Sequence, residues 1–525
     1  MTDATSPRPS SSPRPSSSPS PANSPSPSPA NSSSPTTAAI DTTGIGFRSK
    51  RGPVLIALML STGLVAIDST ILATSVPSIV GDLGGFSQFP WLFSIYLLAQ
   101  AVSVPVYAKL SDTVGRKPII LAGIALFLLG SILCGFAWSM PALIAFRVVQ
   151  GLGAGAVQPM AVTIAGDIYS VAERAKVQGY IASVWAISSV IGPTLGGVFS
   201  EFISWRFIFF VNIPLCFIAG FMLMRRFHEK VAPQRHRIDY PGAVLLTLGI
   251  SALILAVLEG GQAWAWNSPT SIGAFVLGGL LLAAFLLVER RAIEPILPLW
   301  VFSRRLLLTT TLVSLGVGAV ITGLTSFVPT YLEGAINISP LVAGLAVASL
   351  TIGWPIAASQ SGRLYLTIGF RSTVLIGLAI SVVASVLLAL SAPTPNLLVV
   401  TLCCFGIGLG LGLVATPSLI AAQSSVQWNE RGVVTGTNLF ARSIGSAVGV
   451  AIFGAIANGI YAANSAGGGE KSPAVIALAS GSAFIAVAVC AVATVLAALA
   501  MPRRSAPAAA RAASPADAAG AADPA

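Results

Sequence analysis

Charged residues are scarce in this sequence. Asp, Glu, Lys and Arg make up 9% of its 525 residues, whereas soluble domains carry about 25% of these types. Hydrophobic residues make up 54%, and the mean hydropathy is +0.83. A water-soluble core cannot bury that much apolar surface, so the composition excludes an ordinary soluble enzyme.

The residues that build metal and redox sites are also few. The five cysteines lie in apolar runs without Cys-x-x-Cys spacing, and the two histidines share one basic loop. This excludes a disulfide framework, a zinc site and a buried histidine relay. The chain has no Gly-Lys dipeptide for a phosphate-binding loop and no His-Glu-x-x-His motif. We therefore expect no metal, no cofactor and no bound nucleotide.

Both ends of the chain have a composition that cannot form a core. Residues 1–40 contain 14 Ser and 10 Pro, and the residues from Pro502 onward are rich in Ala and Pro. Such segments are typical of disorder. The N-terminal segment also lacks the short apolar stretch of a cleavable signal peptide. We expect 1–52 and 502–525 to be disordered tails.

About fourteen apolar segments lie between the tails, each near the ~20 residues that cross a bilayer as a helix. Ten-residue alternating strands of a barrel are absent. The sequence therefore predicts an all-α integral membrane protein with fourteen transmembrane helices. The expected spans are 53–80, 89–108, 118–138, 141–163, 177–198, 207–224, 241–258, 270–288, 306–332, 341–360, 372–391, 396–420, 432–460 and 474–501.

The basic residues follow the positions of these spans. If both termini are cytoplasmic, 25 of the 29 Lys and Arg lie on the cytoplasmic side, and only Arg206 and Lys471 lie outside. Arg147 and Arg442 lie within helices. This asymmetry is the positive-inside rule. The net charge of +11 therefore reflects membrane topology and not nucleic-acid binding, and we expect a multi-pass protein of the cell membrane.

A short internal repeat divides the chain. Residues 108–117 (AKLSDTVGRK) match residues 362–371 (GRLYLTIGFR) at a constant offset of 254, and both copies link an even to an odd helix. Two such halves suggest two six-helix bundles around a central cavity. We expect the bundles at 53–224 and 306–501, with a basic loop and two extra central helices at 225–305.

One acidic residue, Asp68, lies in the middle of the first predicted helix. An ionised carboxylate at this depth costs about 2.5–3.5 kcal/mol, and residues of this kind are kept for a task or a partner. We interpret Asp68 as a site for protons or a cationic substrate, the alternative being a static buried ion pair. Arg147 lies roughly 9 Å from the outer surface and Asp68 roughly 13 Å. Similar depth makes Arg147 the candidate partner.

Four further polar residues are candidates for the substrate cavity. Gln150 shares with Arg147 a face of small and polar residues in the fourth helix, for which packing alone is the alternative. Trp185 lies in mid-helix and either offers its π face to a cation or faces lipid. Asn438 and Arg442 lie one turn apart in the thirteenth helix.

Glycine and proline gather in the fifth helix, in SSVIGPTLGG. A proline removes a backbone donor and kinks a helix, while glycines permit tight packing. The pattern predicts a hinge between the bundles. Pro and Gly are also common in membrane helices in general. The hinge residues are Gly192, Pro193, Gly196 and Gly197.

The loop of the first repeat carries opposite charges. Asp112 faces Arg116 and Lys117 across a turn at Gly115, in a position where it can also cap a helix N-terminus. We interpret these four residues as a cytoplasmic latch that opens when the bundles move. The alternative is ordinary topogenic charge.

These motifs resemble the major facilitator superfamily, in particular its fourteen-helix drug–proton antiporters. The likeness covers nearly all of 53–501. It is carried by IDSTILATSVP in the first helix, KLSDTVGRK in the loop, RVVQGLGAG in the fourth helix and GPTLGG in the fifth. The stretches WRFIFFVNIP and DYPG also look like this family.

The resemblance implies the superfamily fold, alternating access and export driven by protons. It implies that Asp68 carries protons, that Arg147 belongs to the relay and that Gly192-Pro193 is the antiporter hinge. The chain departs from the family pattern at four positions, which bear on the latch more than on the class of transport. These are Ala108, Thr113, Ser188 and Leu366.

We therefore expect a proton-coupled antiporter that exports amphipathic small molecules, cationic or neutral, in multidrug efflux. Its partners would be the substrate, protons and the lipid bilayer, with no nucleic acid or nucleotide, and it would act as a monomer. The alternatives are a proton-coupled symporter and an exporter of one specific metabolite. A polytopic membrane enzyme, an ATP-driven pump and a non-transporting sensor are disfavoured.

Overall fold

The computed structural model describes residues 46–84, 88, 91–229, 239–260, 264–265, 267–292, 295, 297–464 and 472–503. In these ranges the regular structure is helical, apart from a single bridge between Gly260 and Trp264. Thirteen of the described helices are long and apolar enough to cross a membrane, and a shorter apolar helix, Pro241–Ala256, adds a fourteenth segment. Lipid offers no water to backbone groups, so each segment bonds its own as a helix. The predicted tails lie almost wholly outside the described residues.

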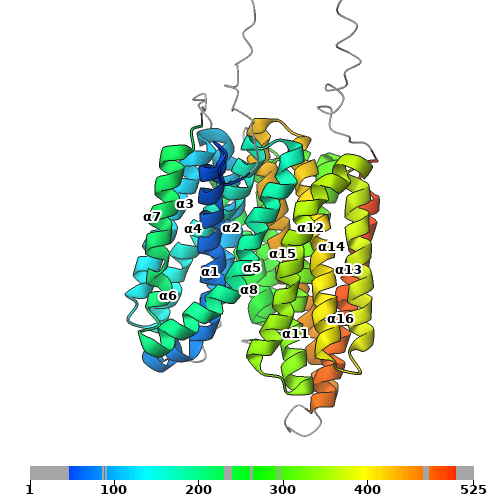
Figure 1. The fold of residues 1–525 in the computed structure, drawn as a ribbon. Coiled ribbons are helices and arrows are strands. Elements are labelled where there is room, and N and C mark those ends of the chain that lie inside the picture. Colours follow the sequence, from blue (N-terminus) through cyan, green and yellow to red (C-terminus); the bar gives the residue numbers. More distant parts are fainter. Residues whose placement is uncertain are drawn as a thin grey trace, which may run out of the picture. The chain divides into compact units, whose positions relative to one another are not determined.

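The first half of the chain forms seven helices that run up and down beside one another (Figure 1). They are α1 (Gly52–Leu83), α2 (Trp91–Val114), α3 (Arg116–Gly135), α4 (Met140–Ile168), α5 (Val171–Phe202), α6 (Phe207–Phe210) and α7 (Asn212–Arg226). The short α6 and the longer α7 together make one membrane-length segment, Phe207–Arg226.

The second half repeats this pattern after a central pair of helices. The central elements are α8 (Tyr240–Glu259), α9 (Pro269–Glu289) and the short α10 (Trp300–Ser303). The following elements are α11 (Arg305–Ile336), α12 (Pro340–Ile368), α13 (Phe370–Ser391), α14 (Leu397–Ser424), the 3-10 turn η2 (Trp428–Glu430), α15 (Arg431–Asn464) and α16 (Pro473–Leu499).

Local sequence explains where several helices begin. Ser139 precedes α4, and its hydroxyl accepts a hydrogen bond from the backbone of Ala142 at 3.4 Å. Ser170 and Glu173 form a capping box before α5. Such side chains satisfy N–H groups that have no partner inside the helix. Because both serines follow apolar runs, each marks the point where one membrane segment ends and the next begins.

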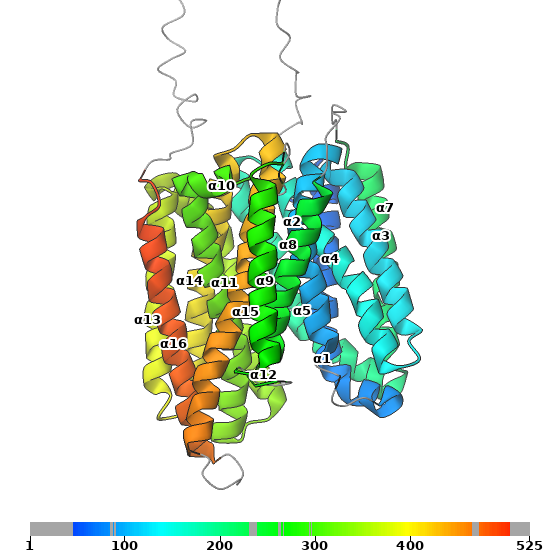
Figure 2. The same cartoon turned by 180° about the vertical axis from the view of Figure 1, so that it is seen from behind.

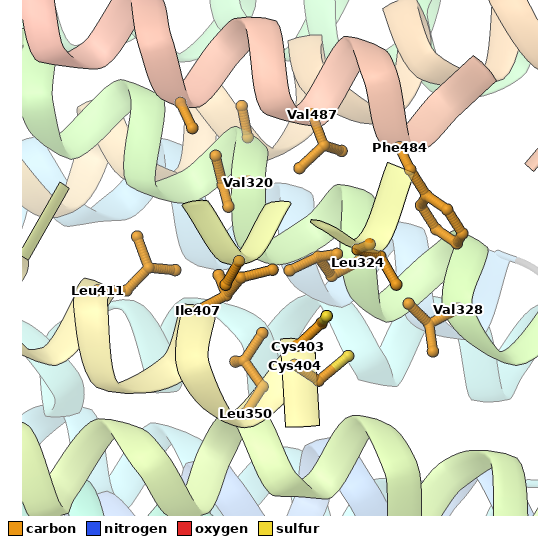
Figure 3. Close-up of a cluster of buried hydrophobic side chains, with 14 of the residues drawn as sticks. Val320, Leu324, Val328, Leu350, Cys403, Cys404, Ile407, Leu411, Phe484 and Val487 are labelled. Carbon is orange, nitrogen blue, oxygen red and sulfur yellow. The ribbon is translucent and has the colours of Figure 1, made fainter. Parts of the chain in front are cut away.

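The hydrophobic cores divide between the two halves. Two clusters of buried side chains draw only on the helices from α1 to α7 and the residues that link them. A third draws on the helices from α11 to α16, and Figure 3 shows Leu324 and Val328 of α11 facing Cys403 and Cys404 of α14. Each half therefore packs around an interior of its own, and a smaller cluster with Ala175 and Tyr365 joins the two halves. We refer to the two groups of helices as the first and second bundles.

The central helices pack where the bundles meet. Leu246 and Ile250 of α8 share a cluster with Leu98 of α2 and Phe440 of α15. Figure 2 shows α8 and α9 lying across the neighbouring ribbons of both bundles. The extra pair therefore lies at the boundary between the bundles without forming a core of its own.

The bundle ends differ in charge. The end at which α1 begins and α16 ends carries Arg51, Lys117, Arg226, Arg290 and Arg503. We call it the basic end, and the other the opposite end. In Figures 1 and 2 the ribbons of the bundles lie closest at the basic end, drawn at the top.

The internal repeat appears as two equivalent turns at the basic end. Gly115, between α2 and α3, has φ +106°, and Gly369, between α12 and α13, has φ +83°. A residue with a Cβ atom is strained in this region of φ, whereas glycine is not. Both copies of the repeat therefore need glycine at this position for the same backbone reason.

Candidate functional site

The acidic residue of the first membrane segment meets an arginine from the fourth. Asp68 of α1 and Arg147 of α4 are each 1% exposed, and Arg147 Nη1 lies 2.6 Å from Asp68 Oδ2. The structure thus joins the two residues for which we predicted similar depth. A buried pair of this kind is held by its own attraction, and removal of one partner costs about 3–5 kcal/mol because the other charge stays buried.

Three neutral side chains complete the surroundings of the carboxylate. Gln150 Nε2 donates to Asp68 Oδ1 at 2.7 Å and to Ser131 Oγ at 2.8 Å. Asn212 Nδ2 also donates to Asp68 Oδ1, at 3.3 Å. Ser131, Gln150 and Asn212 are all fully buried. The carboxylate is therefore bound by donors from α4 and α7 and has no access to solvent in this conformation.

The arginine is fixed by groups of α2 as well. Arg147 Nε donates to the carbonyl of Leu92 at 3.1 Å, and its guanidinium lies 4.1 Å from the centre of the Tyr96 ring. A cation over an aromatic face is stabilised when both are desolvated. Since Gly151 packs directly on the backbone of Tyr96, the small-residue face of α4 brings α2 close enough for these contacts.

The predicted cavity residues fall in different places. Gln150 belongs to the Asp68 cluster and is fully buried. Trp185 is half-buried and packs against the core of the first bundle. Asn438 is buried in α15, where its Oδ1 accepts a hydrogen bond from Ser314 of α11 at 2.8 Å. Arg442 is half-buried one turn further along α15.

The predicted latch joins the two bundles. Arg116 Nη2 lies 2.7 Å from Asp112 Oδ1, as the loop pattern suggested. The backbone N–H groups of Gly432 and Val433 also donate to the Asp112 carboxylate, over 2.9 and 2.7 Å. These residues begin α15, so the helix that Asp112 caps is one that starts 320 residues further along the chain. A carboxylate there satisfies free N–H groups and meets the positive end of the helix dipole.

Arg116 connects the latch to further charges. It is fully buried, its Nε lies 3.0 Å from Asp167 Oδ2, and its guanidinium lies 3.9 Å from the centre of the Trp428 ring. Arg431 Nη1 reaches the other oxygen of Asp167 at 3.0 Å. Asp167 therefore bridges an arginine of the first bundle and an arginine of the second.

Lys117 lies apart from this network. Its Nζ donates to the carbonyl of Met224 at 2.9 Å, and its backbone N–H donates to Glu229 at 2.9 Å. We expected Asp112 to face both basic residues of the motif. The structure corrects this for Lys117, because the first turn of α3 directs the two side chains to different neighbours.

The second copy of the repeat makes a simpler contact. The hydroxyl of Tyr365 in α12 donates to the carbonyl of Val171 at the start of α5, and Gly362 packs on Ala175. Leu366, which corresponds to Asp112, is exposed. In the second copy of the repeat a neutral hydrogen bond thus joins α12 to α5, whereas in the first copy an ionic cluster joins α2 to α15.

One of the glycines of the fifth segment is needed for close packing within the first bundle. A Cβ atom at Gly192 would overlap the hydroxyl of Thr70 in α1, whereas one at Gly197 would meet nothing within 4 Å. The same hydroxyl donates to the carbonyl of Ser188 at 2.9 Å. Gly196 is buried, and Ser75 of α1 donates to its carbonyl at 3.3 Å. Pro193 is half-buried inside a helix that continues to Phe202.

A separate ionic contact ties helices of the first bundle at the opposite end. Asp82 accepts hydrogen bonds from Arg206 at 2.7 Å and from the Trp205 indole at 3.0 Å. These donors hold the pKa of Asp82 below its usual value. The carboxylate is therefore ionised throughout the neutral range and serves as a structural contact.

A comparison with protein families decides the class of the protein. The sequence pattern described as "Major Facilitator Superfamily" matches residues 58–450. The chain belongs to this superfamily. This confirms the predicted resemblance and the predicted all-helical fold. It also confirms the prediction that the protein is a membrane transporter and not an enzyme.

Several relatives in the superfamily are named as multidrug resistance, multidrug transporter or efflux proteins. The chain is 35% identical over 412 residues to "Multidrug resistance protein 3" of Bacillus subtilis, covering 78% of this chain and 80% of the relative. It is 34% identical to "Multidrug transporter protein MdtP" of the same organism, covering 79% and 76%. It is 31% identical to "Efflux pump FUS6" of Gibberella fujikuroi, covering 78% and 76%.

A solved structure shows the same fold. The human organic anion transporter MFSD10 superposes with a TM-score of 0.61 at 16% sequence identity, covering 86% of this chain and 99% of that one. At this identity the likeness concerns the fold alone. It supports the major facilitator arrangement of the helices and says nothing about the substrate.

Sequence reasoning alone did not identify three residues of the Asp68 cluster and the latch. Asn212 lies in the WRFIFFVNIP stretch, and a polar residue beside the apolar run of the sixth segment is a usable signal. Asp167 and Arg431 lie at the basic ends of α4 and α15, where charge is expected for topology alone. Their role as bridges between the bundles depends on helix neighbours that are far apart in sequence.

Proposed function

We propose that this protein is a proton-coupled antiporter that exports amphipathic small molecules by alternating access. The supporting observation is the buried cluster of Asp68 and Arg147. Asp68 is a carboxylate at mid-membrane depth, and such residues in membrane proteins are expensive and commonly mark proton or ion pathways. The names of the relatives in B. subtilis and Gibberella support efflux as the direction of transport.

A proton and an arginine compete for the same carboxylate in this proposal. Arg147 lies 2.6 Å from Asp68 Oδ2, so protonation of that oxygen removes the charge that holds the guanidinium. In the present conformation the carboxylate is 1% exposed. Proton uptake therefore requires a rearrangement that connects Asp68 to water on the outer side of the membrane, where substrate leaves as the proton arrives.

Alternation between two conformations requires the bundles to separate at one end. We assign the moving bodies to 53–224 and 306–501, with 225–305 between them. The ion pairs that link Asp112, Arg116, Asp167 and Arg431 across the two bundles support closure of the basic end in the present conformation. We assign the hinge between the two bundles to the segment 192–197 of α5, where Gly192 packs on Thr70 of α1.

The orientation follows from charge. Basic residues are enriched on the cytoplasmic side of membrane proteins, so we assign the basic end and both termini to the cytoplasm. The present conformation is then closed toward the cytoplasm. We propose that a single chain in the cell membrane carries out transport, since the coupling residues and the latch all belong to one chain.

The test is replacement of Asp68 with Asn, which keeps the shape and removes the titratable charge. We expect proton-driven export of a fluorescent amphipathic dye from vesicles to fall by at least about tenfold, while the protein remains in the membrane. Asp82→Asn, an equal change at the opposite end, should leave export intact. Undiminished proton-driven export by the Asp68 variant would refute the assignment, as would equal losses in the two variants.

A further inference from the structure

Arg442 is a second arginine at membrane depth that the coupling site does not use. It lies eleven residues after the start of α15, or about 16 Å from the basic end at 1.5 Å per residue. That is about the midpoint of a hydrocarbon layer of ~30 Å. A charge at this depth is retained for a partner or a function.

The side chain lies on a part of α15 that other helices largely cover. From Arg431 to Ala447 every residue of α15 is buried or half-buried and none is exposed. Arg442 itself is half-buried, and none of its nitrogen atoms is among the fully buried polar atoms without a partner. The guanidinium of Arg442 is therefore not fully covered and is accessible to a ligand, on a stretch of α15 whose residues are all at least partly covered by protein.

Neighbouring contacts hold the arginine in place. The backbone carbonyl of Arg442 lies directly against Gly318 of α11, where a Cβ atom would overlap it, and Gly445 packs in the same way on Leu315. Helical side chains tilt toward the helix N-terminus. The guanidinium therefore reaches toward the level of the Asn438–Ser314 hydrogen bond, which adds polar groups to this part of the interior.

The described part of the chain provides no counterion for Arg442. Within the described residues the Arg442 side chain makes no hydrogen bond or ion pair. Asp68, the carboxylate at comparable depth, is bound by Arg147, Gln150 and Asn212. Among the described residues of the second bundle the acids are Glu333 and Glu430, and both lie near helix ends.

We propose that Arg442 binds an anionic group of the transported molecule, so that the substrates are amphipathic organic acids bearing a carboxylate. This inference rests on the proposed export function and changes the cationic or neutral substrate expected from sequence. The planar guanidinium presents paired donors that match a carboxylate. An acidic substrate would supply the opposite charge that the interior lacks, whereas a cation would be repelled.

Equilibrium binding to the full-length protein in detergent tests the proposal. Three probes share one skeleton: 1-pyrenebutyrate is anionic, 1-pyrenebutanol is neutral, and 4-(1-pyrenyl)butyltrimethylammonium is cationic. Energy transfer from the tryptophans reports binding at neutral pH without a proton gradient. We expect pyrenebutyrate to bind at least about tenfold more tightly than the other two. Arg442→Gln should abolish this preference and leave the affinity for pyrenebutanol within about twofold.

Two further variants separate charge recognition from folding. Arg442→Lys keeps the positive charge without the planar guanidinium and should retain part of the preference for pyrenebutyrate. Arg363→Gln removes an exposed arginine of α12 and should retain all of it. Should Arg442→Gln fail to fold, the ranking of the three probes by the wild-type protein decides alone.

The proposal is overturned by any of three results. These are equal or tighter binding of the cationic probe by the wild-type protein, no binding of pyrenebutyrate, and an unchanged preference in Arg442→Gln. Equal weakening for all three probes in that variant would assign the arginine to structure alone. Because no gradient is applied, these outcomes are independent of the proton-coupling test at Asp68.

Discussion

Replacement of Asp112 with Ala should open the basic end of the transporter. The carboxylate accepts two hydrogen bonds from the start of α15, at 2.9 and 2.7 Å, and pairs with Arg116 at 2.7 Å. Hydrogen bonds to a charged group contribute about 1.5–3 kcal/mol each. In an open state, however, we expect water to replace the donors of α15 and Arg116 to keep Asp167, which lies 3.0 Å away in the present structure.

We therefore expect a net loss of about 2 kcal/mol from the closed state. Since about 1.4 kcal/mol corresponds to a factor of ten, the ratio of closed to open molecules should fall about thirtyfold. Spin labels at Arg226 and Ser425, which are exposed near the basic ends of α7 and α14, would report the separation of the bundles. The measurement is the distance distribution by double electron–electron resonance in a background without the native cysteines.

A matched control lies in the second copy of the repeat. Leu366 occupies the position that corresponds to Asp112 and is exposed, so Leu366→Ala should leave the distance distribution unchanged. Arg116 and Asp167 remain in the Asp112 variant, so a defect cannot come from their loss. An unchanged distribution in Asp112→Ala would show that the capping of α15 does not hold the closed state, and the reasoning above would be wrong.

Two further predictions concern the contacts that accompany the latch. Gly192→Ala places a methyl group on the Thr70 hydroxyl and should destabilise the protein by about 1–3 kcal/mol. The measurement is the Tm in detergent, which should fall in this variant and not in the control Gly197→Ala. Equal Tm values for the two variants would contradict the packing argument. Tyr365→Phe removes the hydrogen bond to Val171 and should weaken closure by about 1 kcal/mol, a smaller shift in the same spin-label distances than Asp112→Ala gives. A shift as large as that of Asp112→Ala would contradict this ranking.

An acidic substrate would have an electrical consequence. Exchange of one inward proton for one outward monoanion moves two positive charges inward. A membrane potential contributes about 2.3 kcal/mol per charge for each 100 mV, so both movements would run with an inside-negative potential. Export of a monocation against one proton would move no net charge. The dependence of transport on membrane potential therefore distinguishes the two substrate classes independently of binding.

The sequence alone predicted much of the architecture. Long apolar segments must become helices in lipid, because no water is available to their backbone groups, and the asymmetry of Lys and Arg orders those helices in the membrane. The single acid of the first segment stood out for the same reason, since a charge in an apolar run is costly wherever the helix lies. The pairing of Asp68 with Arg147 could be anticipated from depth.

Tertiary structure decided which residues act together. The latch depends on the N-terminus of α15, and nothing local to Asp112 indicates that this helix start lies 2.7 Å away. Asn212 joins the Asp68 cluster because α7 packs beside α1, and Lys117 leaves the latch because α3 turns it toward Met224. Hydropathy and charge describe each helix singly, whereas these contacts depend on how the helices are arranged and rotated. That arrangement is set by small residues at helix crossings, and it leaves Arg442 without an ionic partner among the described residues.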